Sequence, residues 1–167
     1  MAIERLWAPW RGTYVSRIAH ASRPRCIFCL AKRSRHDRKH HVVRRGRYVF
    51  CLLNRYPYSN GHLMIAPYRH IGSFSNLQAH EALELWQMAA LMERHLTALL
   101  HPHGFNMGVN VGRAAGAGIP GHMHFHVVPR WVGDTNFMPT VSGTKIISQS
   151  LAVLYEQLAH RTARNHS

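Results

Sequence analysis

The feature that most constrains this chain is a strict alternation of histidine and apolar residues in the segment 122–128, HMHFHVV. Side chains on a β-strand point to opposite faces in turn. A strand here places His122, His124 and His126 in a row on one face, about 6.5–7 Å apart, and turns the apolar residues between them toward the core. The pattern therefore predicts a half-buried strand whose polar face consists of imidazoles.

Three aligned imidazoles allow two kinds of chemistry. They could be ligands of a hydrolytic zinc ion, which also needs an open position for water. Alternatively, one neutral imidazole could attack phosphorus while its neighbours fix its tautomer and protonate the leaving group. The chain contains 15 histidines, so the three in this segment could lie together by chance. The regular alternation with apolar residues argues against chance.

The segment 112–121, GRAAGAGIPG, directly precedes the histidines. Glycine-rich loops expose backbone N–H groups that cradle phosphate oxygens. Gly116, Gly118 and Gly121 match a G-x-G-x-x-G spacing, but that motif opens a helix in dinucleotide-binding folds, and here it opens a strand. The chain also has no Gly-Lys-Ser/Thr motif. These observations favour a phosphate-binding turn beside the imidazoles and exclude the two common nucleotide-binding loops.

The charge balance narrows the choice of chemistry. The chain has 21 Lys and Arg against 7 Asp and Glu, a net charge of +14 with His neutral. So few carboxylates cannot easily supply the facing pair of a glycosidase or the ligands of a two-metal phosphatase. The positive charge favours anionic partners such as nucleotides or nucleic acid.

The rest of the chain predicts an α+β fold with an antiparallel sheet. The segments 48–53 and 62–66 read as a hairpin with a long, turn-rich loop, and 77–100 has helical spacing. The remaining predicted elements are strands over 105–111 and 122–128, the latter stopped by Pro129, and a terminal helix over 145–160. The basic segment 32–47 is predicted to be an exposed or mobile loop, either simply solvated or in contact with RNA.

These residues resemble the histidine triad family, whose signature is an alternating histidine strand followed by Pro-Arg. The hairpin LNRYPYSNGHLMIAP at 53–67 is also similar to that family. The resemblance implies the histidine triad fold, an antiparallel sheet with one long central helix and a C-terminal helix. It implies an N-terminal arm over 1–22, a single domain over 23–161 and a tail over 162–167.

The resemblance also assigns roles. His124 matches the nucleophile that attacks the α-phosphate, His126 would contact phosphate oxygens, and His122 would support the row with His62 behind it. Asn54 stands where the family places its ribose-binding acid or amide, and Asn110 matches the Asn before the glycine loop. The loop itself differs, because Gly118 and Ile119 replace the usual Gln and Ser and the loop is one residue longer. Phosphate binding would then rest on backbone N–H groups at Gly116, Gly118 and Ile119.

Two flanking segments narrow the resemblance further. The segments 129–139 and 6–11 are similar to the bacterial diadenosine-tetraphosphate phosphorylase branch of the family. This implies cleavage at the α-phosphate of adenosine nucleotides through a nucleotidyl-histidine intermediate, resolved by phosphate or water. It implies no catalytic metal, although Mg²⁺ could accompany the substrate, and it implies a homodimer.

The cysteines predict a metal site of a different kind. Cys26 and Cys29 have the spacing of a zinc half-site and need two more ligands. The family resemblance supplies His70 and His122, which would complete a structural zinc site. The alternative is two small buried thiols. Three cysteines do not make a disulfide scaffold, and no apolar run approaches the length of a membrane span, so a reducing cytoplasm without membrane attachment is expected.

Two rival functions remain open at this point. The first is a basic nucleotide- or RNA-binding protein with an idle histidine row, which predicts salt-dependent binding without turnover. The second is a zinc hydrolase that uses all three histidines of the row as ligands. It predicts that a chelator abolishes activity.

Overall fold

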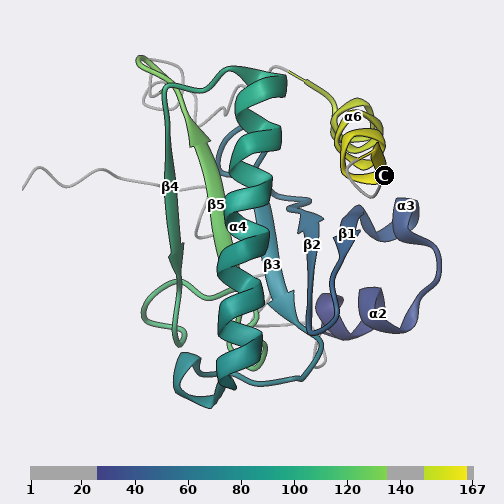
Figure 1. Cartoon of the computed structure of the whole chain (residues 1–167). Helices are drawn as coiled ribbons and strands as arrows, with labels where there is room; N and C mark the ends of the chain where they lie inside the picture. Colours follow the sequence, from purple (N-terminus) through teal and green to yellow (C-terminus); the bar gives the residue numbers. More distant parts are fainter. Residues whose placement is uncertain (1–25, 135–148, 165–167) are drawn as a thin grey trace, which may run out of the picture.

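The structure is a computed structural model that describes residues 26–134 and 149–164. Its helices and strands, drawn in Figure 1, are α2 (Ile27–Arg33), α3 (Asp37–His40), β1 (Val42–Arg45), β2 (Val49–Leu53), β3 (Leu63–Pro67), η1 (Phe74–Asn76), α4 (Ala79–Leu100), β4 (Gly104–Val109), β5 (Phe125–Arg130) and α6 (Leu151–Arg164).

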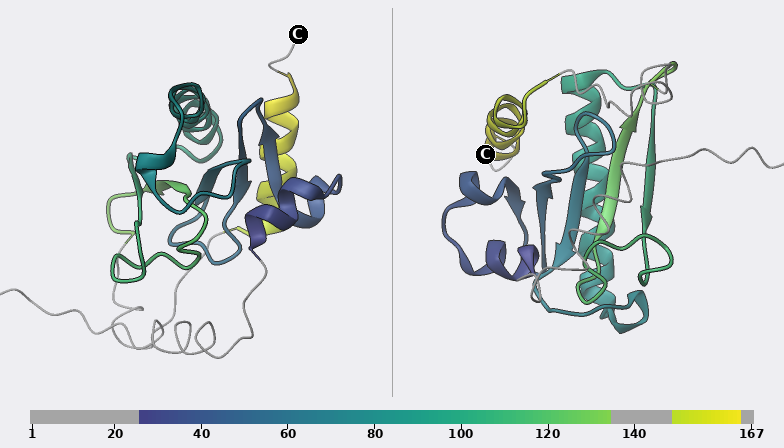
Figure 2. Two further views of the ribbon diagram at one scale, coloured as in Figure 1. Left: turned by 90° about the horizontal axis from the view of Figure 1, so that it is seen from below. Right: turned by 180° about the vertical axis from the view of Figure 1, so that it is seen from behind.

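The five strands form one sheet in the order β1-β2-β3-β5-β4, and every neighbouring pair is antiparallel. Helix α4 covers one face of this sheet, and α2 lies on the other (Figure 2). The predicted α+β fold, with an antiparallel sheet and one long central helix, is confirmed. The predicted hairpin is β2 and β3, which pair from Val49↔Pro67 to Leu53↔Leu63.

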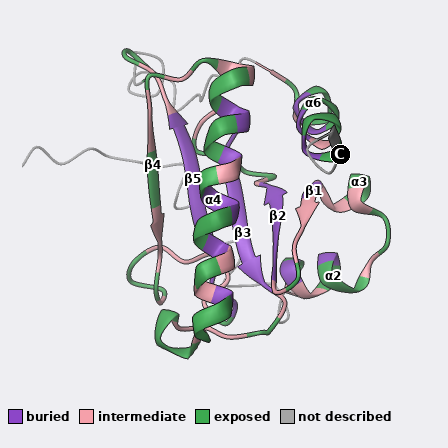
Figure 3. Cartoon of the chain, in the orientation of Figure 1, coloured by how far each residue is buried: buried purple, intermediate pink, exposed green. Residues whose placement is uncertain are grey.

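Alternation along the strands divides the core into two layers. Val49, Cys51 and Leu53 of β2 pack under α4, while Phe50 and Leu52 of the same strand pack against α2. The central strands are therefore buried on both faces, as Figure 3 shows. The same rule decides the position of the histidines, because the apolar residues between them belong to the α4 layer.

Glutamates anchor α4 to the rest of the fold. Glu81, at the third position of the helix, closes a capping box with Gln78 and accepts two hydrogen bonds from Arg69, whose guanidinium lowers the pKa of this buried carboxyl. One turn on, Glu84 accepts from the backbone N–H groups of residues 47–49 at 2.5–2.9 Å and so holds the β1–β2 turn against the helix. The helix ends where His101 adopts a left-handed conformation.

The prediction of an exposed or mobile loop over 32–47 is wrong. This segment contains the end of α2, all of α3 and the edge strand β1. Arg45 explains the order, because its guanidinium donates to both oxygens of Asp37 and to the carbonyls of Ala31 and Ser34 at 2.6–3.2 Å. The basic composition concealed the buried Val42 and Val43, which fix β1 to the body of the protein.

Strand β5 differs from the predicted strand at both ends. It begins at Phe125, so His122 and His124 precede the regular ladder, and it continues through Pro129 to Arg130. Pro129 is tolerated because β3 pairs only with residues 125–127, so the proline nitrogen faces no partner strand there. The strand predicted over 105–111 corresponds to β4, which ends at Val109.

The C-terminal helix also differs from its prediction over 145–160. Helix α6 begins at Leu151, after two non-helical residues, and runs to Arg164. Thr162, which the sequence places in a tail, is buried and donates a hydrogen bond to the carbonyl of Val43. The boundary predicted at residue 161 therefore falls inside a helix that is bound to β1.

The arm predicted over 1–22 lies outside the described residues. The described residues also leave out the segment 6–11, residues 135–139 and the first residues of the predicted terminal helix. Within the described residues, no helix combines the length and the apolar character needed to cross a membrane.

Candidate active site

The three histidines of the row lie on the face of the sheet opposite α4. Strand β3 pairs with β5 through Met64↔His126, and the last residues of β4 flank the other side. The ring centroids of His124 and His126 are 4.8 Å apart and the two rings meet edge to face. The predicted common face is confirmed.

The backbone fixes the tautomer of His124. Its Nδ1 lies 2.8 Å from the carbonyl oxygen of His122, which can only accept a hydrogen bond. Nδ1 therefore carries the proton, and Nε2 of a neutral ring keeps its lone pair. The side chain is only 6% exposed, so this nitrogen is largely shielded from solvent.

His62 fixes the tautomer of His126 in the opposite sense. The backbone N–H of Tyr58 donates to Nδ1 of His62 at 2.9 Å, so the proton of the neutral His62 ring is on Nε2. That Nε2 lies 2.8 Å from Nδ1 of His126 and donates to it. The proton of His126 is then on its Nε2, which is buried and has no hydrogen-bond partner among the described residues. An unsatisfied buried donor of this kind is suited to bind an anionic oxygen.

Asn54 completes this small network. Its Oδ1 accepts from the backbone N–H of Tyr56 at 2.9 Å, which turns Nδ2 toward Nδ1 of His62 at 3.3 Å. The structure thus places His62 behind His126, the histidine at the end of the row, and brings Asn54 to the same group. Both are held by the β2–β3 turn, residues 54–62.

Burial keeps the imidazoles of the row neutral. Desolvation lowers the pKa of His124 from its usual range, and the hydrogen bond to the carbonyl of His122 opposes this only in part. Desolvation, aided by the neighbouring His124, lowers the pKa of His126 to about 4. At neutral pH the rings of His124 and His126 are therefore uncharged. Nε2 of His124 presents a lone pair, and Nε2 of His126 presents an N–H donor.

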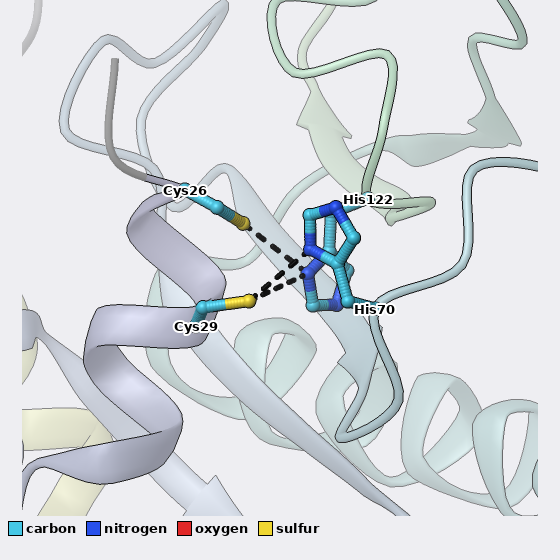
Figure 4. Close-up of side chains that lie close together, drawn as sticks. All are labelled: Cys26, Cys29, His70 and His122. Atoms are coloured by element: carbon cyan, nitrogen blue, oxygen red, sulfur yellow. Dashed lines mark hydrogen bonds between the residues drawn. The ribbon is translucent and has the colours of Figure 1, made fainter. Parts of the chain in front are cut away.

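His122 turns away from the other two and joins a second group of residues. Its Nε2 lies 2.9 Å from the carbonyl of Pro67, so Nε2 carries the proton and Nδ1 has the lone pair. That Nδ1 faces the thiols of Cys26 at 3.2 Å and Cys29 at 3.7 Å, and Cys29 lies 3.1 Å from Nδ1 of His70 (Figure 4). The four ligand atoms all lie within 4.8 Å of one another.

Two loops meet to form this group. The backbone N–H of Met123 donates to the carbonyl of Ile71 at 2.6 Å, which joins the segment after β3 to the start of the histidine row. A Cβ at Gly121 would lie only 3.2 Å from Nε2 of His70, so the absence of a side chain at this position leaves room for that imidazole. The cysteines come from the start of α2, on the other side of the group.

These four residues fit a zinc ion. Zn–S and Zn–N bonds of about 2.3 and 2.0–2.1 Å in a tetrahedron imply S···N separations of about 3.5 Å, and the three measured separations are 3.1–3.7 Å. The second nitrogen of His122 is hydrogen-bonded to a carbonyl, as metal-bound histidines normally are. Burial raises the pKa of the Cys26 thiol, and a bound cation would supply the charge that stabilises its thiolate.

The glycine-rich loop 112–121 has a defined backbone conformation, but no hydrogen bond among the described residues joins its glycines to the three histidines. Gly112 and Gly116 adopt positive φ angles of 78° and 88°, which favour glycine, and the backbone N–H of His122 donates to the carbonyl of Ile119 at its end. Ile119 packs against the α2 layer, while Gly116 and Gly118 are half-buried. The backbone N–H of Gly116 donates to the carbonyl of Arg113 at 3.0 Å, so the prediction that it binds phosphate conflicts with this hydrogen bond. The backbone N–H groups of Gly118 and Ile119 remain the candidate phosphate donors.

Asn110 is placed by strand register. In the β4–β5 ladder Gly108 pairs with His126, and continuing the register sets Asn110 opposite His124. Cross-strand partners share a face, so Asn110 belongs to the face that carries the row. No described hydrogen bond joins it to the histidines.

Sequence reasoning missed two parts of the site. Phe28 is fully buried, and its ring lies 5.0 Å from that of His122 and 4.9 Å from that of His124. The carbonyl of Pro67 selects the tautomer of His122. Phe28 could have been predicted, because it lies between the two cysteines of the Cys-x-x-Cys segment. The contact with the carbonyl of Pro67 could not, because every residue has a backbone carbonyl.

Comparison with known proteins was made for both sequence and fold. The family model described as "HIT domain" matches residues 35–132. A protein of Mycobacterium tuberculosis (strain CDC 1551 / Oshkosh) named "AP-4-A phosphorylase" is 37% identical over 167 residues, covering 97% of this chain and 86% of that protein.

Two solved structures share the fold. A hypothetical histidine triad nucleotide-binding protein from Sulfolobus tokodaii superposes with a TM-score of 0.65 at 22% identity, covering 83% of this chain and 93% of the other. A zinc-bound histidine triad family protein from Mycobacterium smegmatis gives 0.66 at 20% identity, covering 85% and 96%.

Proposed function

This chain belongs to the histidine triad (HIT) domain family, and from that membership we propose that it is an enzyme that cleaves diadenosine polyphosphates such as diadenosine tetraphosphate. His124 is the nucleophile, and a nucleotidyl-His124 intermediate is resolved by inorganic phosphate or water. The observation that carries the proposal is the hydrogen bond from Nδ1 of His124 to the carbonyl of His122.

In the first step Nε2 of His124 attacks the α-phosphorus. The N–P bond forms as the bond from phosphorus to the bridging oxygen breaks, and the remaining nucleotide leaves with that electron pair. The imidazole becomes cationic because both its nitrogens are now substituted. The carbonyl of His122 accepts from the Nδ1–H throughout, so it stabilises the charge that develops on the ring.

His126 supports the same step as a hydrogen-bond donor. Its Nε2–H lacks a partner among the described residues, and its ring touches that of His124. A phosphate oxygen beside His124 would satisfy this donor. The hydrogen bond from His62 keeps the donor in the required tautomer, which gives His62 a positioning role.

In the second step an oxygen nucleophile attacks the same phosphorus, and the N–P electron pair returns to Nε2 of His124. Phosphate as the acceptor yields ADP, and water yields AMP and a proton. The relative named as an AP-4-A phosphorylase, which aligns with nearly the whole chain, favours phosphate.

Three further groups complete the proposed substrate site. Asn54, at the end of β2 and beside His62, would bind the ribose of the transferred nucleotide. Asn110 and the backbone N–H groups of Gly118 and Ile119 would contact phosphate oxygens. Any Mg²⁺ would arrive bound to the polyphosphate.

We assign Cys26, Cys29, His70 and His122 as ligands of a structural zinc ion. Such an ion would fix the start of α2 to the two loops that carry the histidines. No chemical step passes through it. The rival in which the whole row binds one catalytic zinc ion conflicts with the geometry, because the lone pair of His122 faces the thiols and Nε2 of His126 carries a proton.

We also propose that the enzyme is a homodimer. Strand β4 is an edge of the sheet, and Asn106 and Met107 on it are exposed, whereas α3 and α6 contact the other edge strand, β1. An exposed edge can pair with a second copy. Light scattering of the full chain tests this.

The decisive experiment incubates the protein with diadenosine tetraphosphate, with and without inorganic phosphate. ADP that appears only with phosphate supports phosphorolysis, and AMP supports hydrolysis. His124→Ala should abolish turnover but leave nucleotide binding largely intact, and His160→Ala, an exposed histidine on α6, should behave as wild type. Salt-dependent RNA binding without turnover of any dinucleotide would instead favour the binding-protein rival.

A further inference from the structure

The turn between β2 and β3 presents two exposed tyrosines beside the imidazole row. Tyr56 is 65% exposed and Tyr58 is 46% exposed, although the Tyr58 ring contacts the buried His62 and His126. Arg55, also exposed, precedes them and adds a positive charge to the same turn. Exposed aromatic rings next to a cation are the usual elements of a surface on which nucleobases stack.

Tyr58 continues the series of rings that begins with His124. Its ring lies 5.7 Å from that of His126 at an angle of 30°, and 4.6 Å from that of His62 at 37°. The tilted imidazoles cover part of the tyrosine ring, while almost half of Tyr58 still faces solvent. Tyr58 is also bound to the site by its backbone, which donates to Nδ1 of His62.

The opposite end of the row is closed. Phe28 is fully buried against His122 and His124, and the two thiols and His70 enclose the Nδ1 of His122. A ligand that extends from the row toward solvent therefore meets Tyr58, and not Phe28, as its aromatic neighbour.

The chemistry of the displacement fixes the direction in which the leaving group lies. In an in-line displacement at phosphorus the leaving oxygen lies opposite the attacking atom. His124 is only 6% exposed, so it attacks from the floor of the site, and the leaving group must point outward. In a dinucleoside polyphosphate this outward part ends in a second nucleoside, while Asn54 is assigned to the ribose of the transferred one.

We propose that Tyr58 is the stacking platform for the nucleobase of the leaving nucleotide. The inference rests on the proposed function and deepens it, because it explains how the site would prefer dinucleotides to nucleotides with a small leaving group. Tyr56 stands at the outer rim of the same platform, and Arg55 attracts the polyphosphate chain. The stacking requires the ring of Tyr58 and not its hydroxyl group.

The test compares two substrates that transfer the same adenylyl group. Diadenosine tetraphosphate has a leaving group with a base, and adenosine 5′-phosphoramidate has a leaving group without one. Tyr58→Ala should lower kcat/KM for the dinucleotide by about ten-fold to a hundred-fold, mainly through KM, because stacking on an aromatic side chain is lost. Its kcat/KM for the phosphoramidate should fall much less, since the backbone N–H that binds His62 remains, so the ratio of the two kcat/KM values should drop by about ten-fold or more.

Two further variants separate stacking from other roles. Tyr58→Phe keeps the ring and should keep the wild-type ratio between the kcat/KM values of the two substrates. Trp86→Ala removes a ring that is 55% exposed on α4, the other side of the sheet, and should not change the ratio between the substrates.

Equal losses with both substrates would show that Tyr58 acts on the imidazoles or on the transferred nucleoside, and would overturn the inference. An unchanged dinucleotide kcat/KM would overturn it as well. A wild-type protein that turns over neither substrate would refute the proposed function itself, and a wild-type protein active on both with an unaltered ratio in Tyr58→Ala would refute only the inference.

Discussion

The carbonyl oxygen of His122 lies 2.8 Å from Nδ1 of His124, while the imidazole of His122 faces two thiols. One residue thus serves two sites. Its side chain belongs to the predicted metal centre, and its backbone sets the proton position of the predicted nucleophile.

Purified protein is expected to hold one zinc ion per chain, and Cys26→Ser or His70→Ala should lower that content toward zero. Loss of the ion should also lower the melting temperature, because α2 is then no longer joined to the two loops. Elemental analysis and thermal unfolding measure the two effects. Cys51→Ala is the matched control, because Cys51 is buried in the α4 layer away from the cluster. Full zinc content in the Cys26 variant would refute the assignment.

Replacing His62 should weaken catalysis without removing the nucleophile. His62→Ala leaves Nδ1 of His126 without its donor, so His126 can place its proton on the wrong nitrogen. We expect kcat to fall by about ten-fold or more. Nitrogen NMR of the imidazoles provides an independent readout, with a protonated Nε2 on His126 in the wild type and a mixture in the variant. A single, unchanged tautomer of His126 in the variant would contradict the role proposed for His62.

Stability should fall in acid through His126. Its pKa is about 4 in the folded protein and about 6.5 when unfolded. Between these values the unfolded chain binds more protons, so the free energy of unfolding falls as the pH drops from about 6.5 to about 4, by up to about 1.4 kcal/mol for each pKa unit of the shift. Urea titrations at several pH values measure this. His126→Gln should show a shallower dependence, and an identical slope would sink the prediction.

The Arg45 guanidinium should be a stability determinant of the basic segment. Arg45→Ala leaves Asp37 and two carbonyls without their donor, and we expect a loss of about 1–2 kcal/mol in the free energy of unfolding, reduced by the partial exposure of the pair. Arg45→Lys should restore little, since one ammonium cannot reproduce the fork. The exposed Lys39→Ala is the control. Chemical denaturation with no difference between Arg45→Ala and this control would refute the role.

Individual residues show which features of the site the sequence could predict. Alternation was enough to predict the common face of the histidines, because strand geometry fixes it. The Cys-x-x-Cys spacing gave half of the metal cluster, and only the family resemblance pointed to His70. Nothing local could predict this meeting of residues 26, 70 and 122, which depends on the start of α2 and two loops that approach one another in space.

Other errors have equally physical causes. Charge density suggested that 32–47 is a loop, yet one guanidinium that donates to four oxygen atoms orders it. Pro129 suggested a strand end, but a proline costs little where no strand lies beside its nitrogen. Both outcomes depend on partners far away in the sequence.

The triple engagement of His122 limits how this site can be transplanted. Its Nε2 is bound to Pro67, its Nδ1 faces the thiols and its carbonyl holds His124. Grafting only the alternating histidine strand onto another scaffold would leave the first ring free to rotate and the second without a defined proton. A working transplant must carry the cysteine helix, the end of the hairpin and the strand together, as one inseparable unit.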